Sequence, residues 1–284
     1  MSKVAIVTDS TAGFPETILE EYSMHAIPLQ VIWGDTTYQD SIDIQPTEFY
    51  NKLETATVMP STSQPSPAAF KKVYEELNEK GCEILSIHIS SELSGTMASA
   101  LQARDMLPNA KIEIIDSGTT SLALGLPTLL AAQAAKDGAS LEECKQIALK
   151  AQSQAGIYFA VATLEFLHRG GRIGGASAFL GTMLNLKPIL TVQDKRIEAV
   201  ERVRSMSKAI NRLIEIVEEQ TNGSSKIHIG VIHANAPDEA NKLLEKLRDR
   251  LSIKSDAFCM IGEVSPVIGT HTGPGTIGLA YCYE

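Results

Sequence analysis

The stretch that decides the fold is Val4-Ala-Ile-Val-Thr-Asp-Ser-Thr11. Its first four residues are an unbroken apolar run, which predicts a strand buried on both faces, and the polar residues after it predict a loop before a helix from about Pro15. A buried strand followed by a helix is typical of an α/β fold. Because ligands bind at the carboxyl ends of such strands, Asp9, Ser10 and Thr11 are candidate site residues. Capping of the helix from Pro15 is the competing explanation for Ser10 and Thr11.

The same alternation continues through the first half of the chain. Further strands are expected at 26–32, 83–89 and 111–116, and helices at 46–53, 68–80, 97–106, 117–136 and 140–153. This order predicts a three-layer α/β/α domain with a parallel sheet. From about residue 158 the strands at 158–162, 188–192, 197–203, 226–233, 257–264 and 276–283 predict a mixed, largely antiparallel sheet with helices. We therefore expect two α/β domains, 1–157 and 158–284.

Composition narrows the class of protein. The 284 residues are 44% apolar and carry a net charge of -9 with acids and bases interspersed, which argues against a nucleic-acid partner. The four cysteines are widely spaced, so neither a metal site nor a disulfide framework is expected. No apolar run is long enough for a membrane span, and the N-terminus lacks a signal peptide. A cytoplasmic location is expected.

Two hydroxyl-rich stretches precede predicted helices. Pro60–Pro67 combines three prolines with four hydroxyl side chains, a rigid arrangement suited to a carboxylate or phosphate. The alternative is a surface turn in which Ser66 caps the next helix. Ser90–Thr96 follows a strand and also favours an anion. It lacks both the nucleotide P-loop pattern and G-x-S-x-G, so Ser94 is a weak candidate for a hydrolase nucleophile.

Two segments of the second half carry charged or titratable groups among glycines. Residues 165–175 contain Arg169 and Arg172, which can clamp a phosphate, although an exposed arginine-bearing loop is a common alternative. His271 lies in a predicted loop over 269–275, between glycines and threonines. A histidine in such a loop can hydrogen-bond an anion or transfer a proton.

As an ordered set, these motifs resemble the DegV family of bacterial fatty-acid-binding proteins. The motifs that carry the resemblance span the chain: Val4–Thr11, Pro60–Pro65, Ser94–Thr96, Asp116-Ser117, Leu167–Ile173, Val203-Arg204 and Gly269–Gly273. The resemblance implies a long-chain fatty acid at the junction of the two domains, with its acyl chain in a buried apolar tunnel. It also implies a non-catalytic carrier that presents the acid to a separate ATP-dependent fatty acid kinase, which makes acyl phosphate for phospholipid synthesis. No other cofactor is implied, and transient contact with a membrane surface is compatible with this role.

The resemblance assigns roles residue by residue. The carboxylate would be hydrogen-bonded by Thr62, Ser94 and His271, with Ser63 and the Gly95 N–H beside them. The basic positions near the phosphate end, where the kinase docks, match Arg172 and Arg204. Residues that line a tunnel are of the same apolar types as core residues, so the residues of the acyl-chain wall can only be guessed. Our guess is Ile157, Met183, Leu184 and Ile268.

Two other functions are compatible with the residues. An acyl hydrolase would use Ser94 with His271 and an aspartate such as Asp116, but the nucleophile elbow is missing. A regulator that binds a sugar or phosphate would hold a polar ligand in the same place. The carrier is favoured because each buried methylene of an acyl chain contributes about 0.8 kcal/mol, which a mostly apolar site with one polar end would exploit.

Overall fold

The first half of the chain forms a four-stranded parallel sheet. The computed structural model describes residues 3–182, 186–251 and 253–284, so the predicted wall residues Met183 and Leu184 lie outside the described residues. The strand order is β2-β1-β6-β7, and each neighbouring pair is parallel. The strands are β1 (Lys3–Asp9), β2 (His25–Ile27), β6 (Cys82–His88) and β7 (Ile112–Asp116).

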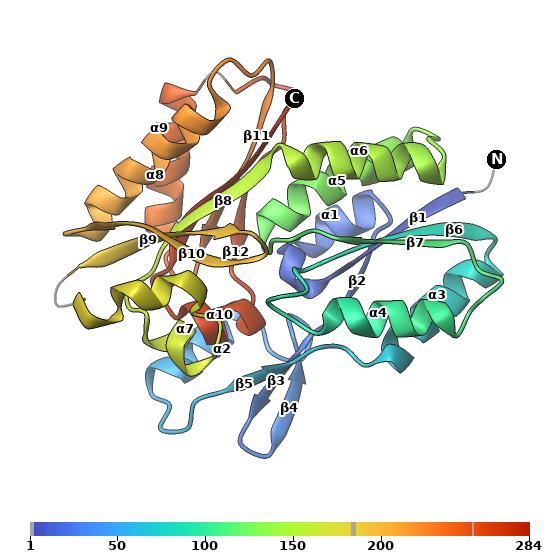
Figure 1. Ribbon diagram of the computed structural model, residues 1–284, viewed down its shortest axis with the longest axis horizontal. Helices are drawn as coiled ribbons and strands as arrows, with labels where there is room; N and C mark the ends of the chain where they lie inside the picture. The colour runs from blue at the N-terminus through green and yellow to red at the C-terminus, as the bar shows by residue number, and fades with distance from the viewer. Residues whose placement is uncertain (1–2, 183–185, 252) are drawn as a thin grey trace.

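Helices cover both faces of this sheet, as Figure 1 shows. Alternate side chains of β1 point to opposite faces: Ile6 packs with one apolar cluster and Val7 with the other. On the Ile6 side lie α1 (Glu16–Glu21), α5 (Leu122–Lys136) and α6 (Leu141–Ser153), and on the Val7 side α3 (Pro67–Glu79) and α4 (Thr96–Asp105). The predicted three-layer arrangement is confirmed.

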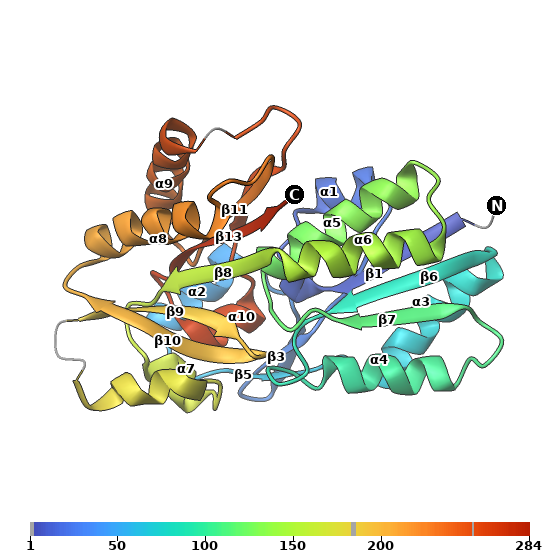
Figure 2. The same ribbon diagram turned by 45° about the horizontal axis from the view of Figure 1, so that its top comes forward.

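The second half forms a six-stranded mixed sheet, in the order β10-β9-β8-β13-β11-β12. The β11–β12 pair is parallel and the other neighbouring pairs are antiparallel, as predicted. Its strands are β8 (Ala155–Ala160), β9 (Lys187–Gln193), β10 (Arg196–Val203), β11 (Ile227–His233), β12 (Cys259–Glu263) and β13 (Ile277–Tyr283). Helices α8 (Met206–Thr221) and α9 (Pro237–Arg250) cover its outer face (Figure 2). The proposed boundary after residue 157 stays a prediction.

A third, small sheet was not predicted. Residues after β2 leave the parallel sheet and form β3 (Gln30–Trp33), β4 (Thr36–Gln39), α2 (Pro46–Glu54) and β5 (Ser61–Ser63), with the antiparallel order β4-β3-β5. The single strand expected over 26–32 is therefore wrong, because the chain changes partners around Pro28. Strands β4 and β5 are short and mostly polar, so they lack the apolar alternation that reveals a strand.

Short helices complete the second half: α7 (Glu165–Arg169), the 3-10 helix η2 (Gly174–Thr182) and α10 (Pro266–Thr272), while η1 (Ser10–Ala12) follows β1. His271 lies on α10, so its predicted loop is wrong. Helix α10 packs so closely on α2 that only glycine fits at position 269. A Cβ there would come within 2.4 Å of the Tyr50 hydroxyl. In the described part of the chain, no helix has the length and apolarity to cross a membrane.

Candidate ligand-binding site

A cavity lies between the parallel sheet and the mixed sheet. It encloses about 780 Å³ of space between atoms, a figure that includes open solvent at its mouth. Leu29, Ile89 and Thr120 line it from segments that follow β2, β6 and β7. Ile157 and Phe159 line it from β8 of the mixed sheet. The cavity therefore occupies the carboxyl ends of parallel strands, where α/β proteins place their ligands.

Most of the cavity wall is apolar. The apolar side chains that line it are Leu29, Ile89, Leu93, Ile157, Phe159, Leu167, Val192, Ile197, Ile232, Val264, Val267 and Ile268. Most of them are buried, and they come from both halves of the chain. A wall of this kind shields a hydrocarbon from water and offers it few polar partners.

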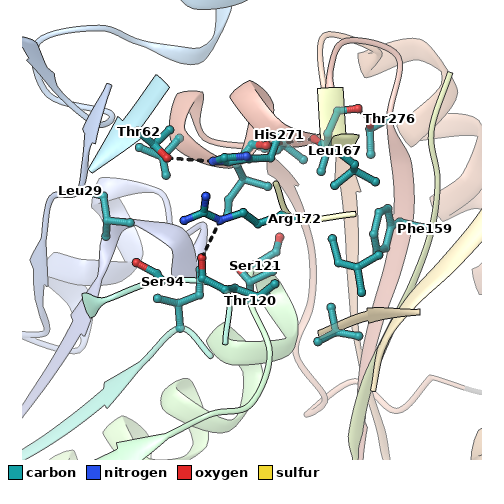
Figure 3. Close-up of a pocket in the computed structure, with 18 of the residues that line it drawn as sticks. Leu29, Thr62, Ser94, Thr120, Ser121, Phe159, Leu167, Arg172, His271 and Thr276 are labelled. Atoms are coloured by element: carbon teal, nitrogen blue, oxygen red, sulfur yellow. Dashed lines mark hydrogen bonds between the residues drawn. The ribbon is translucent and has the colours of Figure 1, made fainter. Parts of the chain in front are cut away.

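At the polar end of the cavity, hydrogen bonds join the two halves of the chain. Thr62 on β5 places its Oγ1 2.8 Å from Nε2 of His271 on α10 (Figure 3). The Arg172 side chain extends between Thr62 and Ser94 in the same view. Its Nε donates to the Leu93 carbonyl at 3.1 Å and its Nη1 to the Gly170 carbonyl at 2.8 Å. Two hydroxyls, an imidazole and a guanidinium thus gather at one end of an apolar wall.

The imidazole of His271 is uncharged at neutral pH. Burial lowers its pKa to about 4, and the positive charge of Arg172 acts in the same direction. Its Nδ1 is buried and has no hydrogen-bond partner among the described residues. Because buried N–H groups are rarely left unpaired, we assign the ring proton to Nε2, which then donates to Thr62. The Thr62 hydroxyl keeps its own hydrogen for a further acceptor.

Packing of His271 accounts for one glycine of the 165–175 segment, Gly170. A Cβ at this position would lie 2.0 Å from Nδ1 of His271, so the ring packs directly on the glycine backbone. On the outer side of His271 lies a second hollow, which Met59, Phe166 and Arg169 line. Thr62, Arg172 and His271 line both spaces. The polar end therefore separates the apolar cavity from a surface hollow that carries arginine.

This arrangement can be compared with known proteins. A family model for DegV, described as an uncharacterised protein family, matches residues 3–284. The chain belongs to the DegV family. A DegV domain-containing protein of Streptomyces coelicolor is 40% identical over 277 residues, which is 97% of each chain.

Solved structures of DegV proteins share the fold over their whole length. A DegV family protein from Thermus thermophilus, described as fatty acid binding, is 36% identical with a TM-score of 0.93, over 99% of this chain and 100% of that one. A stearic acid-binding protein from Eubacterium ventriosum is 26% identical with a TM-score of 0.91, over 100% of this chain and 98% of that one.

The structure brings most of the predicted site residues of this DegV protein together. Those that line the cavity are Thr62, Ser63, Ser94, Ile157, Arg172, Ile268 and His271. Gly95 is exposed beside Ser94, at the N-terminal end of α4. Arg204 is exposed immediately after β10. Neither Gly95 nor Arg204 is among the described residues that line the cavity.

Sequence reasoning missed several cavity residues of this DegV protein. The missed polar residues are Gln64, Thr120, Ser121, Thr272 and Thr276. Thr120 and Ser121 carried a usable signal, because they follow β7, and hydroxyls after a parallel strand are candidate ligands. The apolar residues gave no signal, since their burial makes them indistinguishable from core.

The residues of the hydrolase alternative do not form a hydrogen-bonded triad in the described structure. Ser94 Oγ lies 2.8 Å from Thr96 Oγ1, and His271 Nε2 is occupied by Thr62. Asp116 forms an ion pair of 2.8 Å with Lys195. This geometry gives the hydrolase no support.

The strand-end motif after β1 is structural. Asp9 is fully buried, and its Oδ1 accepts the Thr11 N–H at 3.1 Å, so it caps η1. Ser10 accepts the Leu29 N–H at 3.1 Å and thereby holds a cavity-lining residue. Capping therefore accounts for Asp9 at η1, whereas the helix that begins after Pro15 has no side-chain cap from Ser10 or Thr11. Among the described residues, no group of three or more histidine, cysteine or acidic side chains is arranged to hold a metal ion.

Proposed function

We propose that this protein is a non-catalytic carrier that binds a long-chain fatty acid in the cavity, with the carboxylate at the end formed by Thr62, Ser94 and His271. The observation that carries the proposal is an apolar cavity with a hydroxyl–imidazole pair at one end. Fatty acid binding by the Thermus thermophilus and Eubacterium ventriosum relatives supports it. The acyl chain supplies affinity through many buried methylenes, and the carboxylate fixes the orientation.

The proposed carboxylate contacts follow from the donors present. Thr62 offers its hydroxyl hydrogen, because the His271 ring already donates to its oxygen. Ser94 offers a second hydroxyl, and the Gly95 N–H lies beside it at the start of α4. Ser63 also lines the cavity. A carboxylate accepts several hydrogen bonds at once, so a small number of donors is sufficient.

We further propose that a separate ATP-dependent kinase phosphorylates the bound acid. In this step a carboxylate oxygen attacks the γ-phosphorus of ATP, and ADP leaves with the electrons of the broken bond. The outer hollow gives the polar end a route to the surface, and Arg172 would neutralise the acyl phosphate formed there. Arg204 does not line the cavity, but it is exposed, so we retain it as a candidate residue for docking of the kinase. The product would enter phospholipid synthesis in the cytoplasm.

Extraction of the native ligand tests the carrier proposal. The purified protein is denatured, extracted with organic solvent and analysed by mass spectrometry. We expect about one long-chain fatty acid per chain, or saturable uptake of added stearate where the protein is purified empty. No fatty acid in the extract, together with no uptake of stearate, would overturn the proposal. Recovery of a phosphate or polyol in its place would favour a regulator.

Substitution of the arginines tests the kinase step. Arg172→Ala and Arg204→Ala should each retain stearate and lower the rate of acyl phosphate formation with the partner kinase at least ten-fold. The first variant loses the charge at the reacting end, and the second loses the charge proposed to face the kinase. Arg248→Ala is the matched control, since Arg248 is exposed on α9, which covers the outer face of the mixed sheet, and does not line the cavity. Unchanged rates in both variants would remove these residues from the site.

A further inference from the structure

The helix that carries His271 is capped by a distant aspartate. Ser265 occupies the N-cap position of α10 but makes no side-chain capping hydrogen bond. Asp40 takes this role from 227 positions away: its Oδ1 accepts the Val267 N–H at 3.0 Å. The Asp40 side chain is 1% exposed, and its Oδ2 has no hydrogen bond of normal geometry among the described residues. A buried carboxylate in this position interacts favourably with the helix N-terminus.

Asp40 and Thr62 belong to the same small sheet. Asp40 immediately follows β4, and its N–H donates to the Leu29 carbonyl at 2.9 Å. Thr62 lies on β5, opposite Val31 of β3, and β3 joins the two outer strands. The sheet β4-β3-β5 therefore holds α10 at both ends, with Asp40 at the first turn and Thr62 at His271 in the last turn.

The middle of α10 is fixed on α2. Gly269 packs against the Tyr50 hydroxyl so closely that a Cβ would approach it to 2.4 Å. The same hydroxyl donates to the Val264 carbonyl at 2.9 Å, just before α10. Val267 and Ile268 of this helix line the cavity along with His271. A shift of α10 would therefore move both the apolar wall and the imidazole.

We propose that Asp40 is a positioning residue that sets the place of α10, and through it the Thr62–His271 hydrogen bond and the polar end of the cavity. Asp40 does not line the cavity; it lines a separate groove together with Ser10, Glu263 and Ser265. The effect of Asp40 on ligand binding rests on the proposed function, whereas its effect on the position of His271 does not.

The position of Asp40 also makes the contact sensitive to pH. Burial raises the pKa of Asp40 to about 6. The Ser10 hydroxyl, the Val267 N–H and the Ser265 hydroxyl act in the opposite direction, but their effect is smaller. The other titratable groups that face it are Asp9 after β1, Tyr50 on α2 and Glu263 at the end of β12, and none of them is basic. The carboxylate is therefore ionised above about pH 6 and strengthens its hold on the helix N-terminus there.

Histidine NMR tests the proposal without a ligand. Ring nitrogens of His271 are followed in ligand-free protein labelled with [15N]histidine, and their signals are assigned with His271→Asn. Asp40→Ala should shift the His271 signals at pH 7.5. Asp40→Asn should restore them only in part, to the position that wild type takes below pH 6, because its amide oxygen still accepts from Val267 but carries no charge. The wild-type signals should also move with a midpoint near pH 6, and Asp40→Asn should abolish that transition. Asp35→Asn, at the exposed β3–β4 turn, is the matched control and should behave as wild type.

Stearate titration tests the consequence for binding. Asp40→Ala should weaken binding about ten-fold or more at pH 7.5, whereas Asp40→Asn should remain within about three-fold of wild type. Where Asp40→Ala does not fold, the proposal is tested by Asp40→Asn, which should lose the transition of the His271 signals near pH 6. His271 signals that are the same in wild type, Asp40→Ala and Asp40→Asn at every pH would overturn the proposal. A His271 response to Asp40 in a protein that binds no stearate would support the proposal and overturn the carrier function alone.

Discussion

His88 is buried and His271 is half-buried, and the two histidines have opposite surroundings. His88, at the end of β6, is 0% exposed, and both of its ring nitrogens are hydrogen-bonded: Nδ1 lies 3.0 Å from Asp9 Oδ2 and Nε2 lies 2.7 Å from Ser86 Oγ. Tyr74 completes the set by donating to Ser86 at 2.8 Å. Among the described residues, Thr62 is the one hydrogen-bond partner of the His271 ring, which lines a cavity.

The difference separates a structural network from a ligand site. Asp9, His88 and Ser86 have the residue types of a catalytic triad, but all three are fully buried, so no substrate reaches them. A satisfied buried network rigidifies the core around it. At His271 the polar groups converge on open space, and their hydrogen-bonding capacity is incomplete without a further partner.

The largest effect is expected from the satisfied network. His88→Ala should lower the free energy of unfolding by about 3 kcal/mol or more, because it leaves a void and deprives Asp9 and Ser86 of a partner. Urea denaturation measures the change. His25→Ala, exposed at the start of β2, is the control and should change stability by about 0.5 kcal/mol or less. A loss in His88→Ala as small as that of the control would end the distinction between the two histidines.

The next effect concerns pH and His271. The pKa of about 4 in the folded protein lies below the ordinary histidine pKa of 6.5, so the unfolded chain takes up a proton first as the pH falls. The stability that the neutral ring contributes is therefore complete above about pH 6.5 and lost progressively down to about pH 4. Between pH 7.5 and pH 5, wild type should lose about 2 kcal/mol relative to His271→Ala.

Denaturation of both proteins at the two pH values gives this difference. The effect of Asp40 has the opposite sign, because burial raises its pKa, but both proteins contain Asp40, so it cancels in the comparison. Parallel pH profiles for wild type and His271→Ala would show that His271 is not held neutral.

The smallest effect is expected at Thr62. Thr62→Val keeps the shape of the side chain and removes the hydroxyl, which should weaken stearate binding by about 1–3 kcal/mol while His271 loses its partner. Titration with stearate measures the change. Thr37→Val, on the exposed strand β4 of the same sheet, should bind as wild type. Equal affinities in the two variants would exclude Thr62 from the polar end.

The fold was largely predictable from the sequence, because buried parallel strands and amphipathic helices leave strong apolar patterns. The run Val4–Val7 indicated β1 correctly, and the strands predicted at 188–192 and 197–203 correspond to β9 and β10. The small sheet was not predictable. Its outer strands β4 and β5 are polar and short, and their pairing depends on tertiary contacts with α10.

The candidate site was predictable only at its polar end. Thr62, Ser94 and His271 stand in distinctive polar motifs, whereas Phe159 and Ile232 are ordinary apolar strand residues until the structure places them at a cavity. Asp40 gave no signal at all. It follows a short polar strand, and its partner Val267 is 227 residues away, so only the folded chain reveals their contact.

A structure of the protein with stearic acid bound tests the central claim most directly. The account predicts electron density for the acyl chain along Phe159, Ile232 and Val264, with a carboxylate oxygen within about 3 Å of Thr62 Oγ1. A carboxylate at the opposite end of the cavity, or stearate bound elsewhere while the cavity remains empty, would contradict it.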